Sequence, residues 1–411
     1  MSEKILRTVN YLELPLTTYR RLRHKERIGQ HHWLGTASVA GLLAVSLMVY
    51  ATTTHAITFT ITDLGTPGGT SDARDINEAG QVVGYSETGN FRHAVLWHNG
   101  IMTDLNPVGG FSDAYGINDS GQVVGYNEDN HNNTVAFLWQ NGTMTDLVAQ
   151  GWSQTFATGI NNVGQITGSG FNQQNLQQAF LWQGGTMTDL GALLGFRLSL
   201  AVNINDHGQV IGEYRTPQNY PYGFLWQEGV GMQDLGTLGG DETHPADLNA
   251  NGQVVGESTI EHNQPGVLSD NHAFLWEAGT GMLDLGTLPG DSLSAATGIN
   301  DAGQVVGVSS RRGYPPHPFL WQEGTGMLNL SNLLPSNSGW LLLLASAINE
   351  KGQIVGSGIN PAGENHAFLL NPIQGPVQAP EPSSVFLLGI GLAGWRVVKA
   401  MRRSERGEHN P

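Results

Sequence analysis

The sequence predicts an all-β protein that folds as a seven-bladed β-propeller of four-stranded blades. Two observations lead to this fold class. A motif close to I-N-x-x-G-Q-V-V-G occurs seven times between residues 57 and 370, and a repeat of about 40 to 50 residues is typical of propellers and solenoids. The same region is rich in Gly and shows no sustained helical spacing of apolar residues, which favours short strands joined by turns.

One Asn marks each repeat. The seven residues are Asn77, Asn118, Asn161, Asn205, Asn249, Asn300 and Asn349, at spacings of 41, 43, 44, 44, 51 and 49. A motif close to H-A-F-L-W follows each G-Q-V-V-G, and M-x-D-L-G or a variant follows in all units but the last. Each unit therefore predicts four strands, which we label a to d, in the length expected of one propeller blade.

The second unit illustrates how each strand is assigned. Strand a is expected at 114–118, strand b at 122–127, strand c at 136–139 and strand d at 144–148. The a-to-b connection reads Asn-Asp-Ser-Gly, which predicts a type I turn because Asn favours the first position and Gly accepts positive φ. Strands b and c are almost continuously apolar, as expected of sheets covered on both faces. Neighbouring blades must provide that cover.

The ends of the repeat region predict how the ring closes. The seventh unit stops after His-Ala-Phe-Leu-Leu at 366–370 and has no M-x-D-L-G strand, whereas Phe59–Gly65 supplies a strand of this kind ahead of the first strand a. We expect the N-terminal strand to complete the last blade, because this pairing removes the exposed sheet edges of an open array. An open β-solenoid is the alternative architecture.

The repeated units resemble the HAF repeats of extracellular bacterial proteins, which are named after the tripeptide His-Ala-Phe. That tripeptide occurs at 272–274 and at 366–368. The resemblance covers nearly the whole region 57–370, and it implies that this region acts outside the cell.

The first 56 residues have the order of parts of a secretory signal. Five basic residues between Arg20 and Arg27 precede an apolar stretch from Trp33 to Tyr50, and small residues follow. This order predicts a signal peptide over 1–56 with cleavage after Ala56, because small residues are accepted one and three positions before the cut. An uncleaved membrane anchor is the alternative, although the apolar run is short for a membrane span.

The C-terminal residues resemble the PEP-CTERM sorting signal. A linker at 371–384 carries the motif Pro380-Glu381-Pro382, and the segment 385–411 holds an apolar run and a basic tail. The resemblance implies recognition by exosortase, a membrane protease-transpeptidase of Gram-negative bacteria that make exopolysaccharide. The run, expected to be helical, is shorter than the roughly 20 residues of a membrane span, which favours transient insertion in the inner membrane. A disordered Pro-rich tail is the alternative.

Charge and composition limit the partners. The net charge is −16, and only 7 of the 19 Lys and Arg residues lie between residues 57 and 390. A surface this acidic repels phosphate backbones, so we expect no nucleic-acid partner, whereas basic partners, cations and neutral sugars remain. The chain has no Cys, which excludes disulfides, thiolate zinc sites and Cys nucleophiles.

Loop lengths distinguish the two faces of the ring. The a-to-b and c-to-d turns are nearly constant, whereas the d-to-a connections vary and the b-to-c connection of the fifth unit, expected at 257–272, is long. These variable connections emerge on the same face, and binding sites tend to lie on variable loops over a fixed scaffold. In the d-to-a connections we expect four acidic residues near the axis, as candidates for cation or ligand binding: Asp72, Asp113, Asp241 and Asp291.

Known catalytic motifs are missing from the sequence. It contains no His-Glu-x-x-His, Gly-x-Ser-x-Gly or calcium-loop motif, so we predict no catalytic residue, no metal and no cofactor. A His begins strand c in four units, at His93, His272, His317 and His366. Because equivalent positions are spread around a ring, packing is favoured over metal ligation. We expect the repeated Trp of strand c in the core rather than on a sugar-binding surface.

These observations favour a non-catalytic binding or structural module, exported to the extracellular matrix or outer surface of a Gram-negative bacterium. Exopolysaccharide or a surface protein is the expected partner. The alternative is a polysaccharide-cleaving enzyme that uses the axial carboxylates as acid and base. We expect no Arg, Tyr or His beside those carboxylates, and this expectation favours the binding module.

Overall fold

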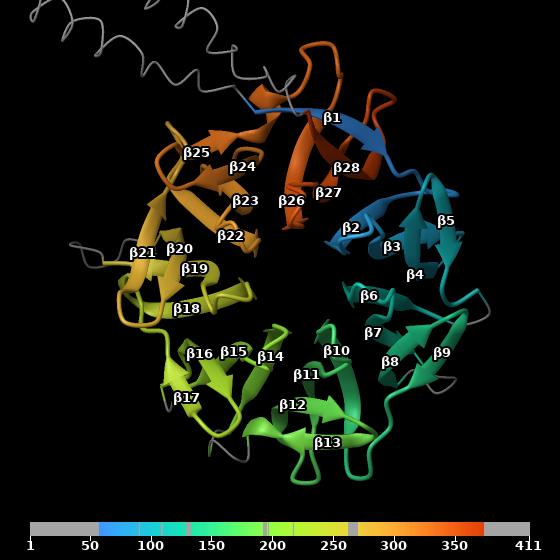
Figure 1. Cartoon of the computed structure of the whole chain (residues 1–411), viewed down its shortest axis with the longest axis vertical. Coiled ribbons are helices and arrows are strands. Elements are labelled where there is room, and N and C mark those ends of the chain that lie inside the picture. The colour runs from blue at the N-terminus through green and yellow to red at the C-terminus, as the bar shows by residue number, and fades with distance from the viewer. Residues whose placement is uncertain are drawn as a thin grey trace, which may run out of the picture. The chain divides into compact units, whose positions relative to one another are not determined.

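The computed structural model describes residues 57–373, except 90, 108–109, 129–132, 192–194, 196, 217 and 262–269. These residues form seven four-stranded sheets, which are arranged as blades around one axis (Figure 1). The predicted seven-bladed propeller is therefore confirmed. The predicted signal peptide at 1–56 with its cleavage site at Ala56, the sorting motif at 380–382 and the segment 385–411 lie outside the described residues.

Each sheet is antiparallel and follows the order a, b, c, d from the axis outward. The innermost strands are β2 (Ser71–Ile76), β6 (Ser112–Ile117), β10 (Ser153–Ile160), β14 (Ser199–Ile204), β18 (Gly239–Leu248), β22 (Leu293–Ile299) and β26 (Leu341–Ile348). The second strands are β3 (Val82–Thr88), β7 (Val123–Glu128), β11 (Ile166–Phe171), β15 (Val210–Arg215), β19 (Val254–Ile260), β23 (Val305–Ser310) and β27 (Ile354–Ile359).

The outer half of each blade holds strands c and d. The third strands are β4 (Phe91–His98), β8 (Thr134–Gln140), β12 (Gln177–Gln183), β16 (Pro221–Gln227), β20 (Asn271–Glu277), β24 (His317–Gln322) and β28 (Asn365–Ile373). The outermost strands are β5 (Ile101–Asp104), β9 (Thr143–Asp146), β13 (Thr186–Asp189), β17 (Gly231–Asp234), β21 (Gly281–Gly286), β25 (Gly326–Asn329) and β1 (Thr58–Asp63). A 3-10 turn, η1 (Leu330–Leu333), follows β25. Among the described residues, no helix has the length and apolar character needed to cross a membrane.

The apolar core is divided among the seven interfaces between blades. Each cluster of buried side chains joins two neighbouring blades, as where Leu96 of the first blade packs with Ile117 of the second. The Phe of strand c is fully buried in six blades, at Phe137, Phe180, Phe224, Phe274, Phe319 and Phe368. Because burying an apolar side chain of this size contributes about 1.5 to 3 kcal/mol, each blade depends on its neighbours for stability.

The repeated Trp of strand c belongs to these same interfaces. Trp97, Trp226 and Trp276 are buried. Trp139, Trp182 and Trp321 are partly buried and pack against the neighbouring clusters. The six indoles are thus part of the core, as the sequence predicts.

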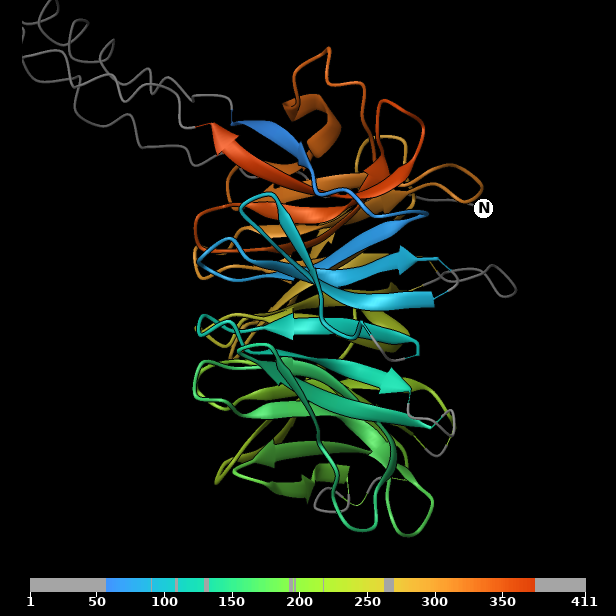
Figure 2. The ribbon, with the colours of Figure 1, turned by 90° about the vertical axis from the view of Figure 1, so that its right-hand side faces the viewer.

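The N-terminal strand closes the ring. β1 pairs with β28 in antiparallel register, with Phe59 opposite Pro372 and Asp63 opposite Phe368. The blue strand lies along the red one in both views (Figures 1 and 2). The Phe59 side chain is 2% exposed and packs in the last interface with Leu342 and Phe368. The predicted closure is confirmed, and the open solenoid is excluded.

The seven repeated Asn residues form a closed ring of hydrogen bonds. The Nδ2 of each Asn donates to the backbone carbonyl of the Asn in the next blade, at 2.9–3.1 Å, and Asn349 completes the circle by donating to Asn77. All seven side chains are buried. Each Oδ1 accepts the backbone N–H of the Gln four residues later, at 3.0 Å in the case of Gln122. The fixed spacing of N-x-x-G-Q follows from these two contacts.

The Gly of V-V-G in strand b makes room for a bulge in strand a. The pairing of strands a and b shifts its register in every blade, for example between Ala114 and Gly116. A Cβ atom on Gly125 would lie 1.9 Å from the carbonyl oxygen of Asp113. Only Gly allows the two backbones to approach this closely.

Two boundaries differ from the predictions. β28 continues to Ile373, because it pairs with β1 up to Thr58, so three residues of the predicted linker 371–384 belong to the last blade. In the fifth blade the ladder of β19 and β20 extends to the pair of Thr259 and Asn271. The b-to-c connection there is consequently 261–270 rather than 257–272.

Candidate functional site

The connections divide the ring into two faces. We call the face with the b-to-c and d-to-a connections the variable face, and the face with the a-to-b and c-to-d turns the uniform face. On the uniform face every a-to-b turn is closed by a hydrogen bond from the Gly N–H to the Asn carbonyl, at 3.0 Å for Gly80 and Asn77. The Gly residues have φ of 71–80°, as the predicted type I turn closed by Gly requires. Irregular features are found instead on the variable face.

The four acidic residues predicted for the variable face belong to four different blades. Asp72 lies in β2, Asp113 in β6 and Asp241 in β18, whereas Asp291 precedes β22. The first three are therefore in innermost strands and not in connections as predicted. The strands begin earlier than the A-x-x-I-N motif indicates, because pairing with strand b continues to residues such as Ser71.

Asp113 is fully buried and holds two guanidinium groups. Arg74 Nη2 lies 3.0 Å from Asp113 Oδ2, and Arg92 binds the same oxygen. The guanidinium carbon of Arg92 lies 3.9 Å from the centre of the Tyr85 ring. Burial raises the pKa of Asp113, while Arg74 and Arg92 oppose this change. The expectation that no Arg, Tyr or His lies beside these carboxylates is wrong, because the interface of blades 1 and 2 unites residues from distant strands and His317 lies beside Asp291.

Asp72 and Asp291 also have basic or polar side chains close to their carboxylates. Burial raises the pKa of Asp72, against the charges of Arg74 and Arg92. The Oδ2 of Asp291 accepts a hydrogen bond from Ser309 Oγ at 2.9 Å and lies 3.0 Å from His317 Nδ1. Asp72 and Asp113 thus share one charge cluster, whereas Asp291 is fixed within blade 6.

The His residues that begin strand c pair with carboxylates. Three of them contact the Asp of the outermost strand in their own blade: His93 with Asp104, His272 with Asp284 and His366 with Asp63, at 2.7–2.9 Å. In the described part of the chain, no group of three or more His, Cys, Asp or Glu residues is arranged to hold a metal ion. The pairs link strands c and d, which is the structural role that the sequence favours.

Blade 5 departs from its neighbours where it reaches the variable face. β18 has ten residues, and its register against β19 shifts close to its start. Thr259 Oγ1 holds the resulting bulge, accepting the N–H of Glu242 at 3.0 Å and donating to its carbonyl at 3.3 Å. A Cβ atom on Gly240 would lie 2.2 Å from this oxygen. Because bulges change the direction of strand side chains, this one presents Asp241 and Glu242 at the face.

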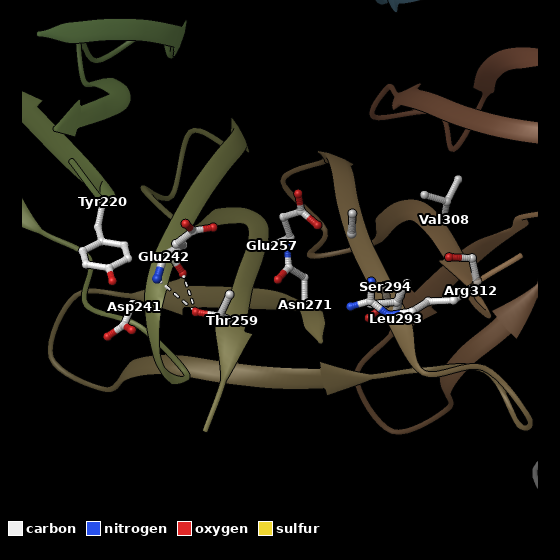
Figure 3. Close-up of a pocket in the computed structure, with 12 residues that line it drawn as sticks. Tyr220, Asp241, Glu242, Glu257, Thr259, Asn271, Leu293, Ser294, Val308 and Arg312 are labelled. Atoms are coloured by element: carbon white, nitrogen blue, oxygen red, sulfur yellow. Dashed lines mark hydrogen bonds between the residues drawn. The ribbon is translucent and has the colours of Figure 1, made fainter. Parts of the chain in front are cut away.

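A cavity of about 710 Å³ opens beside this bulge, between blades 5 and 6 (Figure 3). We call it the blade-5 cavity. Its size lies in the range of about 300 to 1,000 Å³ that is usual for small-molecule sites. An aromatic ring, three carboxylates, an amide and a guanidinium group contribute to its lining: Tyr220, Asp241, Glu242, Glu257, Asn271 and Arg312. Of the four acidic residues predicted from sequence, Asp241 lines this cavity.

Two basic side chains, Arg312 in the cavity lining and His244 beside Glu242, are close to carboxylates. Arg312 Nη2 lies 3.2 Å from Asp270 Oδ1. His244 Nδ1 lies 2.8 Å from Glu213 Oε1, and its Nε2 lies 3.8 Å from Glu242 Oε2. The hydrogen bond to Glu213 and the nearby carboxylate charges raise the pKa of His244, against the effect of desolvation.

A second cavity, of about 480 Å³, lies along the axis and is lined by Asp75 and Asp247. Each carboxylate joins two blades through backbone N–H groups. Asp75 accepts from Ile117 of the next blade at 2.9 Å, and Asp247 accepts from Ile299 of the next blade at 2.9 Å. Burial raises the pKa of Asp75 to about 6. Burial raises the pKa of Asp247 to about 7, with a further contribution from the charge of Asp75.

These two axial carboxyls are not among the site residues predicted from the sequence. The signal is present, because Asp precedes I-N or L-N at 75 and 247, where four other units have Gly or Ala at 116, 159, 298 and 347. At Gly159 a Cβ atom would lie 2.5 Å from Asn203 Oδ1 of the next blade. Strand a is so close to its neighbour here that the position holds either a small residue or a polar group bonded across the interface.

Comparison with known proteins identifies the C-terminal signal. Residues 378–403 match the model of the PEP-CTERM protein-sorting motif. The predicted motif is confirmed, and it implies an exported, cell-surface protein that exosortase recognises. A comparison with curated proteins gives no match.

Similar solved structures have very different sequences. The β-propeller domain of the trilobed protease from Pyrococcus furiosus aligns with a TM-score of 0.49 at 9% identity, over 79% of this chain and 99% of that chain. The lectin BP39L from Burkholderia pseudomallei aligns with a TM-score of 0.41 at 9% identity, over 74% and 97%. A puromycin-hydrolyzing peptidase from Mycobacterium tuberculosis aligns with a TM-score of 0.43 at 14% identity, over 71% and 50%. These similarities say nothing about what this chain binds or cleaves.

Proposed function

We propose that the chain is a non-catalytic propeller of HAF-type repeats, processed by exosortase and bound to matrix exopolysaccharide through its variable face. The sorting motif at 378–403 supports the exported location. We propose that Asp241 lines the binding cavity, whereas Asp72 and Asp113 belong to the charge cluster of blades 1 and 2 and Asp291 is fixed within blade 6.

The lining of the blade-5 cavity is the observation that carries the binding function. Planar polar groups such as those of Asp241, Asn271 and Arg312 can each hydrogen-bond two neighbouring sugar hydroxyls. An aromatic ring such as that of Tyr220 offers an apolar face against which a pyranose ring packs. A concave site that combines these groups on an exposed face suits a saccharide.

A polysaccharide-cleaving enzyme would use two carboxyl groups as acid and base. Asp113 is instead neutralised by Arg74 and Arg92, and Asp291 is bound to Ser309 and His317. Fixed partners of this kind favour a structural role for these two carboxylates. Although the sequence favours binding on the opposite expectation of no basic partners, we prefer binding to catalysis because these partners hold two of the four predicted carboxylates in place.

Binding to matrix polysaccharide tests this proposal directly. The secreted protein should cosediment with exopolysaccharide purified from the producing cells, and heat-denatured protein should stay in the supernatant. The number of reducing ends in the exopolysaccharide should not increase during a long incubation with the protein. Absence of cosedimentation would contradict the binding role, and release of reducing ends would favour the enzyme.

The processing of both chain ends is tested by mass spectrometry of the extracellular fraction. The mature protein should begin at Ile57 and end near Pro380-Glu381-Pro382, so that the tail containing Arg402 and Arg403 is absent. In a bacterial strain without exosortase, the protein should retain that tail. A secreted form with Met1 or with the intact tail would refute this part of the proposal.

A further inference from the structure

The carboxylates of the blade-5 cavity give it a negative lining. Asp241, Glu242 and Glu257 line the cavity, and they lie on β18 and β19 (Figure 3). The two cationic groups nearby are each beside a further carboxylate: Arg312 pairs with Asp270 and His244 with Glu213. His244 Nε2 also lies 3.8 Å from Glu242 Oε2, so five carboxylates surround two basic side chains here.

This charge limits the class of saccharide. A chain of uronic or sulfated sugars would bring like charges together, which is unfavourable at close range. A neutral sugar can donate hydroxyl groups to the carboxylates, but it brings no positive charge to compensate for the water that these ionised groups lose. A sugar with a protonated amino group forms charge-assisted hydrogen bonds to the carboxylates and also offsets their negative charge.

We infer that the blade-5 cavity binds an amino-sugar polysaccharide with free, protonated amino groups, an inference that rests on the proposed matrix-binding function. Tyr220 is 42% exposed at the edge of the cavity, and its ring is available to pack against a pyranose. Glu242 and Glu257 lie on adjacent strands and hold the ammonium group, while Asn271 and Arg312 bind ring hydroxyls.

The other blades differ from blade 5 at the position of Glu257. The corresponding residues of strand b are Tyr85, Tyr126, Ser169, Glu213, Val308 and Ser357. Glu213, the other acid among them, is hydrogen-bonded to His244. The bulge at Gly240, which presents Glu242, is in β18 and therefore also belongs to blade 5. The saccharide site formed by these acidic side chains is consequently assigned to one interface and is not repeated around the ring.

Isothermal titration of the secreted protein tests this inference. The probes are a glucosamine hexamer, its fully N-acetylated form and a uronic-acid hexamer, at pH 6 and low salt. The glucosamine hexamer should bind best. The double variant Glu242→Gln/Glu257→Gln should weaken it by about tenfold or more, since a hydrogen bond to a charged group contributes about 1.5 to 3 kcal/mol and 1.4 kcal/mol corresponds to tenfold.

A matched variant separates the site from general charge. Glu228→Gln/Glu323→Gln removes the same two charges from exposed c-to-d turns of the uniform face, and it should change the affinity by less than about twofold. Tyr220→Ala should weaken the glucosamine and N-acetylated hexamers alike, because stacking does not depend on the amino group. Circular dichroism verifies that each variant is folded.

The outcomes distinguish this inference from the function on which it rests. If matrix polysaccharide binds but the glucosamine hexamer binds no better than the N-acetylated or uronic-acid form, the inference is refuted and the proposed function stands. Equal losses in the two double variants also refute it, because the attraction is then nonspecific. If none of the three hexamers and no matrix polysaccharide binds, both proposals fail.

Discussion

At the scale of single residues, the repeat motif is explained by contacts between blades rather than within them. The Asn of each unit donates to the next unit and accepts a backbone N–H of its own. Its side chain is buried at all seven positions, where an unpaired polar group is costly. One Asn therefore fixes both the a-to-b turn and the distance between neighbouring innermost strands.

The substitution Asn161→Ala tests this double role. It removes the bond to the Asn205 carbonyl and leaves the Gln165 N–H without its acceptor. We expect a loss of about 1 to 3 kcal/mol in the free energy of unfolding, the cost of leaving a buried polar group unsatisfied. Urea denaturation measures it.

The adjacent Asn162 provides the control, because it also bonds across the interfaces but is exposed. Asn162→Ala should cost less than half as much, since water replaces the lost contacts. Equal losses of unfolding free energy in the two variants would contradict an added contribution from burial in the Asn ring.

At the scale of elements, β1 has an effect beyond its six residues. It covers the outer edge of β28, and Phe59 fills the interface between blades 6 and 7. Without β1 the last blade would expose an unpaired strand, and exposed edges promote aggregation. The ring is closed by hydrogen bonds between the two ends of the repeat region and not by a covalent link.

Removal of residues 57–65 should consequently lower the melting temperature strongly or cause aggregation. A milder form is Phe59→Ala, for which we expect a loss of about 3 to 5 kcal/mol, as is usual for a buried Phe. Thr62→Ala in the same strand is the control, because Thr62 is exposed, and it should have little effect. Scanning calorimetry compares the three variants, and an unchanged melting temperature after the deletion would contradict closure by β1.

At the scale of the whole molecule, seven innermost strands converge on one axis and bury carboxyl groups there. The pKa of Asp75 is about 6 and that of Asp247 about 7, above the ordinary value of about 3.9 for the unfolded chain. Between these values the folded state holds protons that the unfolded state has lost. Stability from these groups is complete below about pH 4 and decreases as the pH rises toward 7.

The free energy of unfolding should therefore fall from pH 5 to pH 8. One unit of pKa corresponds to about 1.4 kcal/mol, so the two carboxyls together contribute a few kcal/mol to this change. Asp247→Asn should flatten the dependence measured by urea denaturation, because the amide does not titrate. Glu323→Gln, an exposed site, should leave the slope unchanged. Parallel curves for wild type and Asp247→Asn would contradict a raised pKa at Asp247.

The sequence by itself determined the class, the number of blades and the closure, because these depend on local periodicity and on which strand is missing from the seventh unit. It also determined the sorting motif at 380–382, which is a linear signal. Only the tertiary structure decided which residues meet. The Asn ring, the pairing of Asp113 with Arg74 and Arg92, and the blade-5 cavity all unite residues from different blades, and their contacts depend on interface geometry that no repeat spacing encodes.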